Sequence, residues 1–218
     1  TGTTSINVTG DGNPYANVVE RENMVYQTKM YGSTYFKYNF NEHFSFKQTI
    51  GGDYRLIKNE NFAGPKAFQI SAPSNAFSNY GTVTTTHYAL ESLLDYHRTF
   101  DKHDLSVVAA YNFEDFATET VQINGRNYTN DLIQTISPAN IAADGASVTK
   151  SQNRLISYLA RANYAYDDRF LLSLSVRADG SSKFGSANKF GYLPAASAGW
   201  RISNEKFFPT GILDYLKI

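Results

Sequence analysis

The sequence of 218 residues contains no cysteine, so disulfide bonds, thiolate metal sites and cysteine nucleophiles are excluded. It also lacks the run of about eighteen apolar residues that a membrane-spanning helix requires. Any segment that crosses a membrane must therefore cross as β-strands, whose hydropathy signal is weaker. The formal net charge is zero, which removes the long-range attraction that favours nucleic-acid binding.

The first ten residues, TGTTSINVTG, show neither the basic start nor the apolar core of a signal peptide. Either a signal peptide has been removed or the sequence is an internal piece of a longer protein. The composition favours strands and turns over helices, because 16 Tyr, 15 Phe and 15 Gly stand against 1 Trp and 2 Met. A hydrophobic content of 42% is too high for a disordered chain.

Alternation of apolar and polar residues is the main structural signal. Between residues 170 and 181 the even positions are apolar and the odd positions after Leu171 are polar or charged, as expected for a strand with one greasy face. The pattern recurs along the chain. It predicts strands over 28–40, 44–57, 82–100, 105–118, 152–166, 170–181 and 192–202, and the start of a further strand at 215–218.

The predicted connections alternate in length. Short turns are expected at 41–43, 101–104 and 167–169, and longer loops at 58–81, 119–150 and 183–191. Transmembrane barrels of bacteria have short periplasmic turns and long extracellular loops. Aromatic residues gather on the apolar face beside the short turns, where we expect a periplasmic girdle: Tyr38, Phe40, Phe44, Phe46, Tyr96, Phe100, Tyr164, Tyr166, Phe170 and Trp200. The alternative is a soluble sandwich whose second sheet buries these rings.

The opposite face of the predicted strands is charged. In a barrel that face lines the lumen, where mixed charges meet water or a plug. The residues predicted to face the lumen or plug are Lys37, Lys47, Asp53, Arg55, His87, Glu91, Asp95, Glu114, Arg161, Arg177, Asp179 and Arg201.

The predicted loops are the better place for recognition, because exposed rings there can stack on sugars or dock a partner protein. The candidates are Phe62, Phe68, Phe77, Tyr80 and Tyr128. His43 and His103 fall in predicted turns and are expected to be exposed. The run DGSS at 179–182 is interpreted as structural, with Gly180 allowing a bend and Asp179 capping a turn.

The chemistry expected of the chain is binding and not catalysis. No histidine spacing fits a metal site, and no phosphate loop is present. His87, Glu91, Asp95 and His97 share one predicted strand face, which could bind a cation or activate water, but polar packing is the interpretation we favour. We therefore expect no catalytic residue, no metal and no cofactor.

The C-terminal third resembles the barrel signature of the SusC/RagA-type TonB-dependent outer-membrane transporters. One strand ends in R-x-D-G-S-S-x-F-G, a hairpin carries G-x-x-P-x-x-S-x-G-W-R-I-S-x-E-x-F, and the next strand begins with L-K. The matching residues are Arg177, Asp179, Gly180, Ser181, Ser182, Phe184 and Gly185, then Gly191, Pro194, Ser197, Gly199, Trp200, Arg201, Ile202, Ser203, Glu205 and Phe207, then Leu216 and Lys217. The likeness is strong over 155–218 and looser before.

The resemblance implies an all-β fold: about eight antiparallel strands of a plugged transmembrane barrel of about twenty-two strands. It further implies import of an oligosaccharide or peptide across the outer membrane of a Gram-negative cell, energised through TonB, with a SusD-like surface lipoprotein as partner. Residues 1–218 are then expected to be barrel wall alone, without plug, TonB box or closing strands. A soluble all-β module that binds carbohydrate or protein is the alternative.

Overall fold

The structure is a computed structural model, and it describes residues 14–65, 67, 76–128, 132–137, 139–185, 189–208 and 214–218. Its elements are α1 (Pro14–Val19), β1 (Arg21–Asn39), β2 (Phe44–Ala63), β3 (Phe77–Phe100), β4 (His103–Arg126), β5 (Asn140–Tyr166), β6 (Phe170–Ser181), β7 (Phe190–Trp200) and the short 3-10 helix η1 (Ile202–Asn204). No helix within these ranges is long and apolar enough to cross a membrane.

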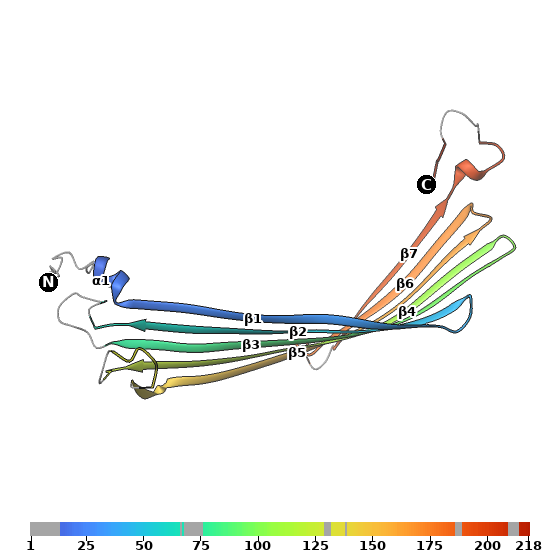
Figure 1. Cartoon of the computed structure of the whole chain (residues 1–218). Coiled ribbons are helices and arrows are strands. Elements are labelled where there is room, and N and C mark those ends of the chain that lie inside the picture. Colours follow the sequence, from blue (N-terminus) through green and yellow to red (C-terminus); the bar gives the residue numbers. More distant parts are fainter. Residues whose placement is uncertain are drawn as a thin grey trace. The chain divides into compact units, whose positions relative to one another are not determined.

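The seven strands form one sheet in the order of the sequence, from β1 to β7 (Figure 1). β5 pairs antiparallel with β6, and β6 pairs antiparallel with β7. The all-β, antiparallel fold expected from the sequence is therefore confirmed. The last residues also behave as predicted, because Lys217 bridges Arg201 and the backbone of Ile218 exchanges two hydrogen bonds with Trp200.

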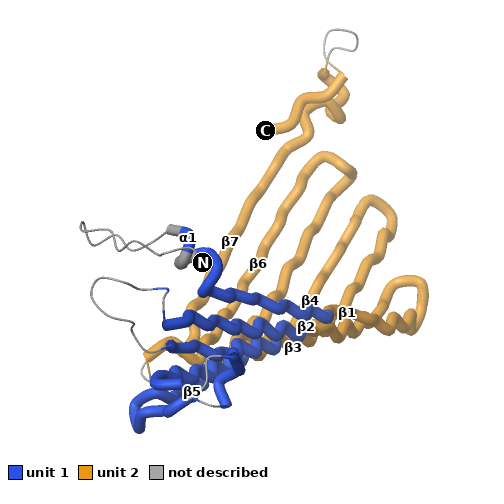
Figure 2. The backbone as a smooth tube through the Cα atoms, turned by 60° about the vertical axis from the view of Figure 1, so that its left-hand side comes forward, with its two compact units in different colours: residues 1–30, 53–86, 117–152 blue, residues 31–52, 87–116, 153–218 orange. Residues whose placement is uncertain are grey.

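The chain divides into two compact units, which we name by the connections they contain (Figure 2). The loop-end unit comprises residues 1–30, 53–86 and 117–152. The turn-end unit comprises residues 31–52, 87–116 and 153–218.

Several strands of the loop-end unit extend further than the sequence predicts. β2 continues to Ala63 and β3 begins at Phe77, so both ends of the expected loop 58–81 are strand. In the same way, β4 ends at Arg126 and β5 begins at Asn140, inside the expected loop 119–150. Within these extensions, residues 58–61 (KNEN) are polar at both parities and residues 142–147 (AADGAS) are small or polar, so neither run shows the apolar alternation that predicts a strand.

The short turns are close to the prediction, with two corrections. Asp167 and Asp168 adopt positive φ of 52° and 51°, which Asp tolerates in tight hairpins and which returns the chain from β5 to β6. The turn before β4 is only Asp101 and Lys102, because the positive φ of Asp101 closes it, so His103 is the first residue of β4. The strand expected to end at Ile202 ends at Trp200 instead, where η1 follows.

The register confirms that the two residue series lie on opposite faces. Leu174 is opposite Ala162 on β5 and Ala196 on β7, whereas Ser175 is opposite Arg161 and Ala195. Directly opposed residues share a face of an antiparallel pair. The even series of β5, β6 and β7 therefore forms one apolar face, and the odd series forms a mixed polar face.

The apolar face of the turn-end unit is open. Leu174 and Val176 are 48% and 46% exposed, and no second sheet covers them within the described residues. The described side chains that are buried all lie in the loop-end unit: Phe62, Ala63, Ala67, Ala76 and Ser78. A soluble sandwich would bury the apolar face, so this arrangement favours a wall with lipid on that side.

Candidate functional site: two faces, a rim and a groove

The aromatic residues predicted to form a girdle contact one another along the turn-end unit. Tyr38 and Phe44 lie within 4.9 Å and 5.2 Å of Phe40, measured between ring centroids. Phe170 and Trp200 stack at 6.3 Å. The rings thus form clusters beside the short turns, as amphipathic rings do at a membrane surface.

His103 joins this aromatic group and corrects the expectation of an exposed turn residue. Its ring stacks on Phe100 at 5.0 Å and lies 5.0 Å from the ring of Tyr166. Its Nδ1 is 2.6 Å from the hydroxyl of Tyr164. The sequence does not indicate this contact, because Asp-Lys-His-Asp at 101–104 is typical of a polar turn.

The apolar face also holds a polar pair whose hydrogen bonds are satisfied internally. The Ser92 hydroxyl donates to Gln48 Oε1 at 2.6 Å, and Gln48 Nε2 donates to the backbone oxygen of Glu91 at 2.8 Å. Both residues belong to the even series of their strands, with Phe46 and Leu94. A polar pair that satisfies itself in this way is compatible with lipid.

On the polar face, the predicted charged residues form local pairs. Arg177 Nε donates to Asp179 Oδ1 at 2.7 Å, and neither residue lies in a turn. The Nε2 atom of His87 lies 3.2 Å from Glu114 Oε2, and its ring stacks on Phe116 at 4.1 Å.

Other members of the predicted lumenal set are spread along the sheet. Lys47 lies 4.9 Å from the ring centre of Tyr35, and Arg55 donates to Gln27 at 3.5 Å. The remaining members lie in β1 (Lys37), β2 (Asp53), β3 (Glu91, Asp95) and β5 (Arg161). No group of three His, Asp or Glu side chains within the described ranges could hold a metal ion.

Arg201 departs from the predicted wall position, since it follows the end of β7 and belongs to a charged rim. It forms an ion pair with Asp168 and lies 5.7 Å from the ring of Tyr215. The Asn204 amide donates to the Asp168 backbone and carboxylate oxygens at 2.9 Å and 3.1 Å. These contacts fold the segment after β7 onto the β5–β6 turn.

Glu205 is the centre of the rim. Its carboxylate accepts hydrogen bonds from Trp200 Nε1 at 3.1 Å and from Arg169 at 3.0 Å. Arg169 also forms an ion pair with Asp167 at 2.7 Å, and Lys102 forms an ion pair with the Asp167 carboxylate at 3.3 Å. The hydrogen bond from Trp200, followed by Arg169, lowers the pKa of Glu205, and Lys102 lowers the pKa of Asp167. Three successive turns are thereby joined.

Three of the five recognition candidates lie on strands, outside the loops in which they were predicted. Phe62, Phe77 and Tyr80 are on strands β2 and β3 and not in a loop, because these strands extend beyond their apolar parts. Phe62 is 4% exposed and is packed edge-on against Tyr128 at 5.3 Å. Tyr128 itself hydrogen-bonds Ser78 at 2.5 Å and the Thr135 carbonyl at 2.9 Å. Phe68 lies outside the described residues.

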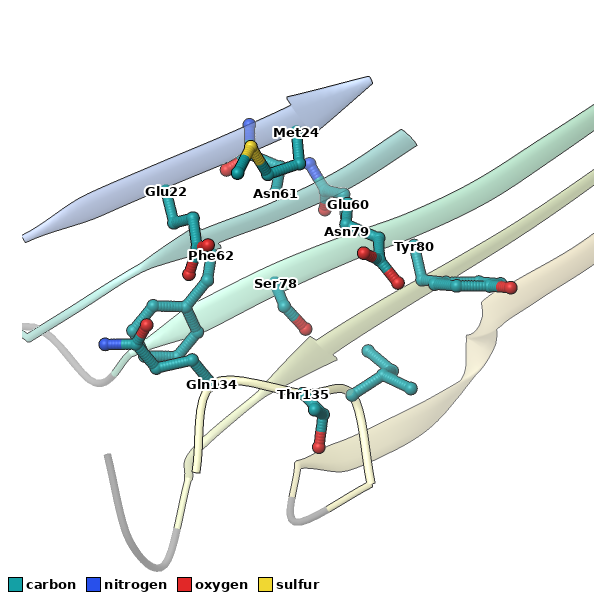
Figure 3. Close-up of a pocket in the computed structure, with 11 residues that line it drawn as sticks. Glu22, Met24, Glu60, Asn61, Phe62, Ser78, Asn79, Tyr80, Gln134 and Thr135 are labelled. Atoms are coloured by element: carbon teal, nitrogen blue, oxygen red, sulfur yellow. The ribbon is translucent and has the colours of Figure 1, made fainter. Parts of the chain in front are cut away.

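Beside this small core lies a groove of about 410 Å³, formed by β1, β2, β3 and residues 134–136. Figure 3 shows Glu22 and Phe62 near one end and Tyr80 at the other, with Ser78 between them. No pattern in the sequence indicates this groove, because its walls come from segments more than a hundred residues apart.

No family model matches the chain. It is 31% identical to TonB-dependent receptor P39 of Formosa agariphila over 90% of this chain and 20% of that protein. It is 26% identical to TonB-dependent receptor SusC of Bacteroides thetaiotaomicron over 84% of this chain and 18% of SusC.

Solved structures of the RagAB peptide transporter share the fold, with a TM-score of 0.82 at 17% identity over 94% of this chain and 23% of that chain. RagAB in a closed-closed state gives a TM-score of 0.81 at 17% identity, over 91% and 22%. The chain corresponds to a barrel segment of the SusC/RagA-type TonB-dependent receptors. It spans about a fifth of the length of the curated receptors that it matches. Those relatives are receptors and transporters and not enzymes, as expected.

The TonB-dependent receptor signature now has a physical explanation in this chain. Trp200 and Glu205 hydrogen-bond each other, and Arg201 pairs with Asp168, so the W-R-I-S-x-E run forms the rim. Gly180 lies within β6 and is paired with Ile156 and Phe190, which corrects the expected bend. A Cβ there would lie 2.7 Å from the ring of Phe190, so a larger side chain would displace that ring. Asp179 is paired with Arg177 and does not cap a turn.

Proposed function

We propose that this chain forms part of the wall of a TonB-dependent importer in the outer membrane of a Gram-negative cell. Residues 1–218 would supply barrel strands, and the whole receptor would take up an oligosaccharide or a peptide. The observation that carries the proposal is the open apolar face of the turn-end unit, with aromatic rings beside its short turns.

The length of this face fits a bilayer. The apolar series of β6 runs from Phe170 to Gly180 and is opposed by the even series of β5 and β7. Ten steps of about 3.3 Å give roughly 33 Å along the strand, or roughly 25 Å along the membrane normal at a tilt of about 40°. Apolar bands of outer-membrane barrels are about 25 Å tall.

On β5 and β4, ion pairs replace apolar side chains after this length. Arg154 pairs with Asp115 at 2.7 Å, and Lys150 pairs with Glu119 at 2.7 Å. These charges belong to the series that carries Tyr158 and Tyr111, whose rings lie 5.3 Å apart. We place the outer edge of the hydrocarbon layer between Tyr158 and Arg154, because charges are costly within it.

The polar series would face the interior of the barrel. Arg161, Arg177 and Asp179 would line the lumen or contact a plug, together with Lys47 and His87. Charges of both signs suit a hydrated or polar filling. In this family setting, a SusD-like surface lipoprotein would close the receptor from outside, and TonB would supply the energy through the plug.

The first test uses the full-length receptor that contains this chain. The protein should fractionate with the outer membrane and change its mobility on gels when heated. Deleting the receptor should abolish uptake of its nutrient, as should a protonophore, and a surface lipoprotein should co-purify with it. A protein that stays in the soluble fraction without detergent would refute the proposal and support a soluble binding module.

A further inference from the structure

We propose that the groove beside Phe62 and Tyr80 is a binding site for an uncharged sugar unit. The proposal rests on the importer function only for its setting at a cell surface. Glu22, Phe62, Ser78 and Tyr80 belong to the even series of their strands, opposite the series that we propose for the lumen. The site would therefore hold glycan at the outer side of the wall, apart from the route of import.

The groove is firmly built on one side. Phe62 and Ser78 are each 4% exposed, and Tyr128 ties them to residue Thr135 through its ring and its hydroxyl. A Cβ on Gly125 would lie 2.7 Å from Ile136, so the 132–137 segment is packed closely against β4. A site whose wall is ordered in advance loses little entropy when a ligand binds.

The charges of the lining exclude anions. Two carboxylates, Glu22 and Glu60, line the groove, with no lysine or arginine among the described lining residues. The nearby Lys58 is already engaged, because it pairs with Glu60 at 2.9 Å and lies 5.1 Å from the ring of Tyr26. A phosphate, sulfate or uronic acid would be repelled by Glu22, whose charge is not paired within the described residues.

The remaining polar groups suit hydroxyls. Glu22 and Gln134 have no hydrogen-bond or ion-pair partner within the described part of the chain, so their oxygen and nitrogen atoms are available to a ligand. Carboxylate and amide oxygens accept hydrogen bonds from hydroxyls, and an amide nitrogen donates. The Tyr80 ring offers an apolar surface to the C–H face of a pyranose. A groove of about 410 Å³ lies in the range of small-ligand sites.

The experiment measures binding to the purified full-length receptor in detergent by calorimetry. The probes are maltohexaose, cellohexaose, xylohexaose and mannohexaose, with a sulfated oligosaccharide and a lysine-rich peptide as charged comparisons. We expect at least one neutral hexasaccharide to bind and the sulfated one not to bind. Because binding and not uptake is measured, failure here would leave the importer proposal standing. Uptake that survives deletion of the receptor would contradict the importer proposal and leave this one standing.

Variants locate the site. Tyr80→Ala should weaken binding of the neutral sugar about tenfold, the equivalent of about 1.4 kcal/mol, whereas Tyr80→Phe should retain it because the ring remains. Glu22→Gln should weaken it less than Tyr80→Ala, since an amide still accepts a hydroxyl. Tyr35→Ala removes an exposed ring outside the groove and should change nothing.

Heat-dependent gel mobility shows whether each variant is folded, and Tyr80→Phe keeps the test valid if Tyr80→Ala fails to fold. Binding of a neutral sugar that is lost in Tyr80→Ala and retained in Tyr80→Phe supports the proposal. It is overturned if no neutral probe binds, if binding is unchanged by Tyr80→Ala, or if only the lysine-rich peptide binds and Glu22→Gln abolishes that.

Discussion

A single arginine placed on either side of β6 tests which face meets lipid. Leu174 lies four residues from Phe170, at roughly 13 Å along a series of roughly 33 Å, and is therefore near the middle of the apolar band. Its side chain is 48% exposed and its neighbours across the strands are Ala162 and Ala196, so an arginine fits sterically.

We expect Leu174→Arg to reduce the free energy of folding into a bilayer by about 2–4 kcal/mol, the cost of arginine at the midplane of an outer-membrane barrel. Ser173→Arg, one residue earlier on the polar face and opposite the uncharged Asn163 and Ser197, should change it by less than about 1 kcal/mol, because an arginine can still donate to the Asn163 side-chain oxygen. Leu174→Ala separates the effect of the charge from loss of the leucine side chain.

The assay is equilibrium folding of the full-length receptor into lipid vesicles against urea, read by heat-dependent gel mobility. Its counterpart in cells is the amount of receptor recovered in the outer-membrane fraction. Equal losses for the two arginine variants, or a larger loss for Ser173→Arg, would show that the apolar series does not face lipid. The assignment of the polar series to the lumen would then also be wrong.

Three further perturbations test the rim, the polar pair and the covered glycine. Because the folded pKa of Glu205 lies below its ordinary 4.5, its charge stabilises the fold above about pH 4.5 and this contribution is lost as the pH falls through the folded pKa. Glu205→Gln should therefore flatten the dependence of the midpoint temperature on pH in that range, and an unchanged profile would contradict the rim contacts. A double-mutant cycle of Gln48→Leu and Ser92→Ala should give a coupling of about 0.6–1.7 kcal/mol in vesicle folding, and a coupling near zero would show that their hydrogen bond contributes nothing. Gly180→Val should lower the midpoint temperature by displacing the Phe190 ring, and Phe190→Ala should relieve that loss; no relief would assign the glycine another role.

The strands with an open apolar face could be predicted from sequence because one face of each carries apolar residues and the other carries polar ones. The alternation from Phe170 to Ala178 is a direct consequence, and the structure confirms it. In the strand extensions that were missed, residues such as Asn59, Glu60 and Asn61 carry no alternation. Strand pairing there depends on backbone hydrogen bonds, which leave no pattern in side-chain polarity.

Contacts between distant segments were the other part that the sequence could not predict. The signature contains Trp200 and Glu205, but nothing in it identifies Arg169 as the partner of Glu205, 36 residues earlier. The groove has the same difficulty, since Phe62 meets Tyr128 only after β3 and β4 have returned the chain. The charged residues in and beside the short turns were the only feature of the sequence that indicated the rim.

The order β1 to β7 has a consequence for how such walls change during evolution. Each strand is hydrogen-bonded to its neighbours in the sequence, so a hairpin can be gained, lost or exchanged without interrupting any other pair. Because strands come in antiparallel pairs, a change of two strands preserves the inside and outside of every strand that follows. Crossovers within the turns at 40–43, 101–102 and 167–169 would therefore produce chimeric receptors in which the diameter, or one outer segment, is altered while the rest of the wall keeps its register.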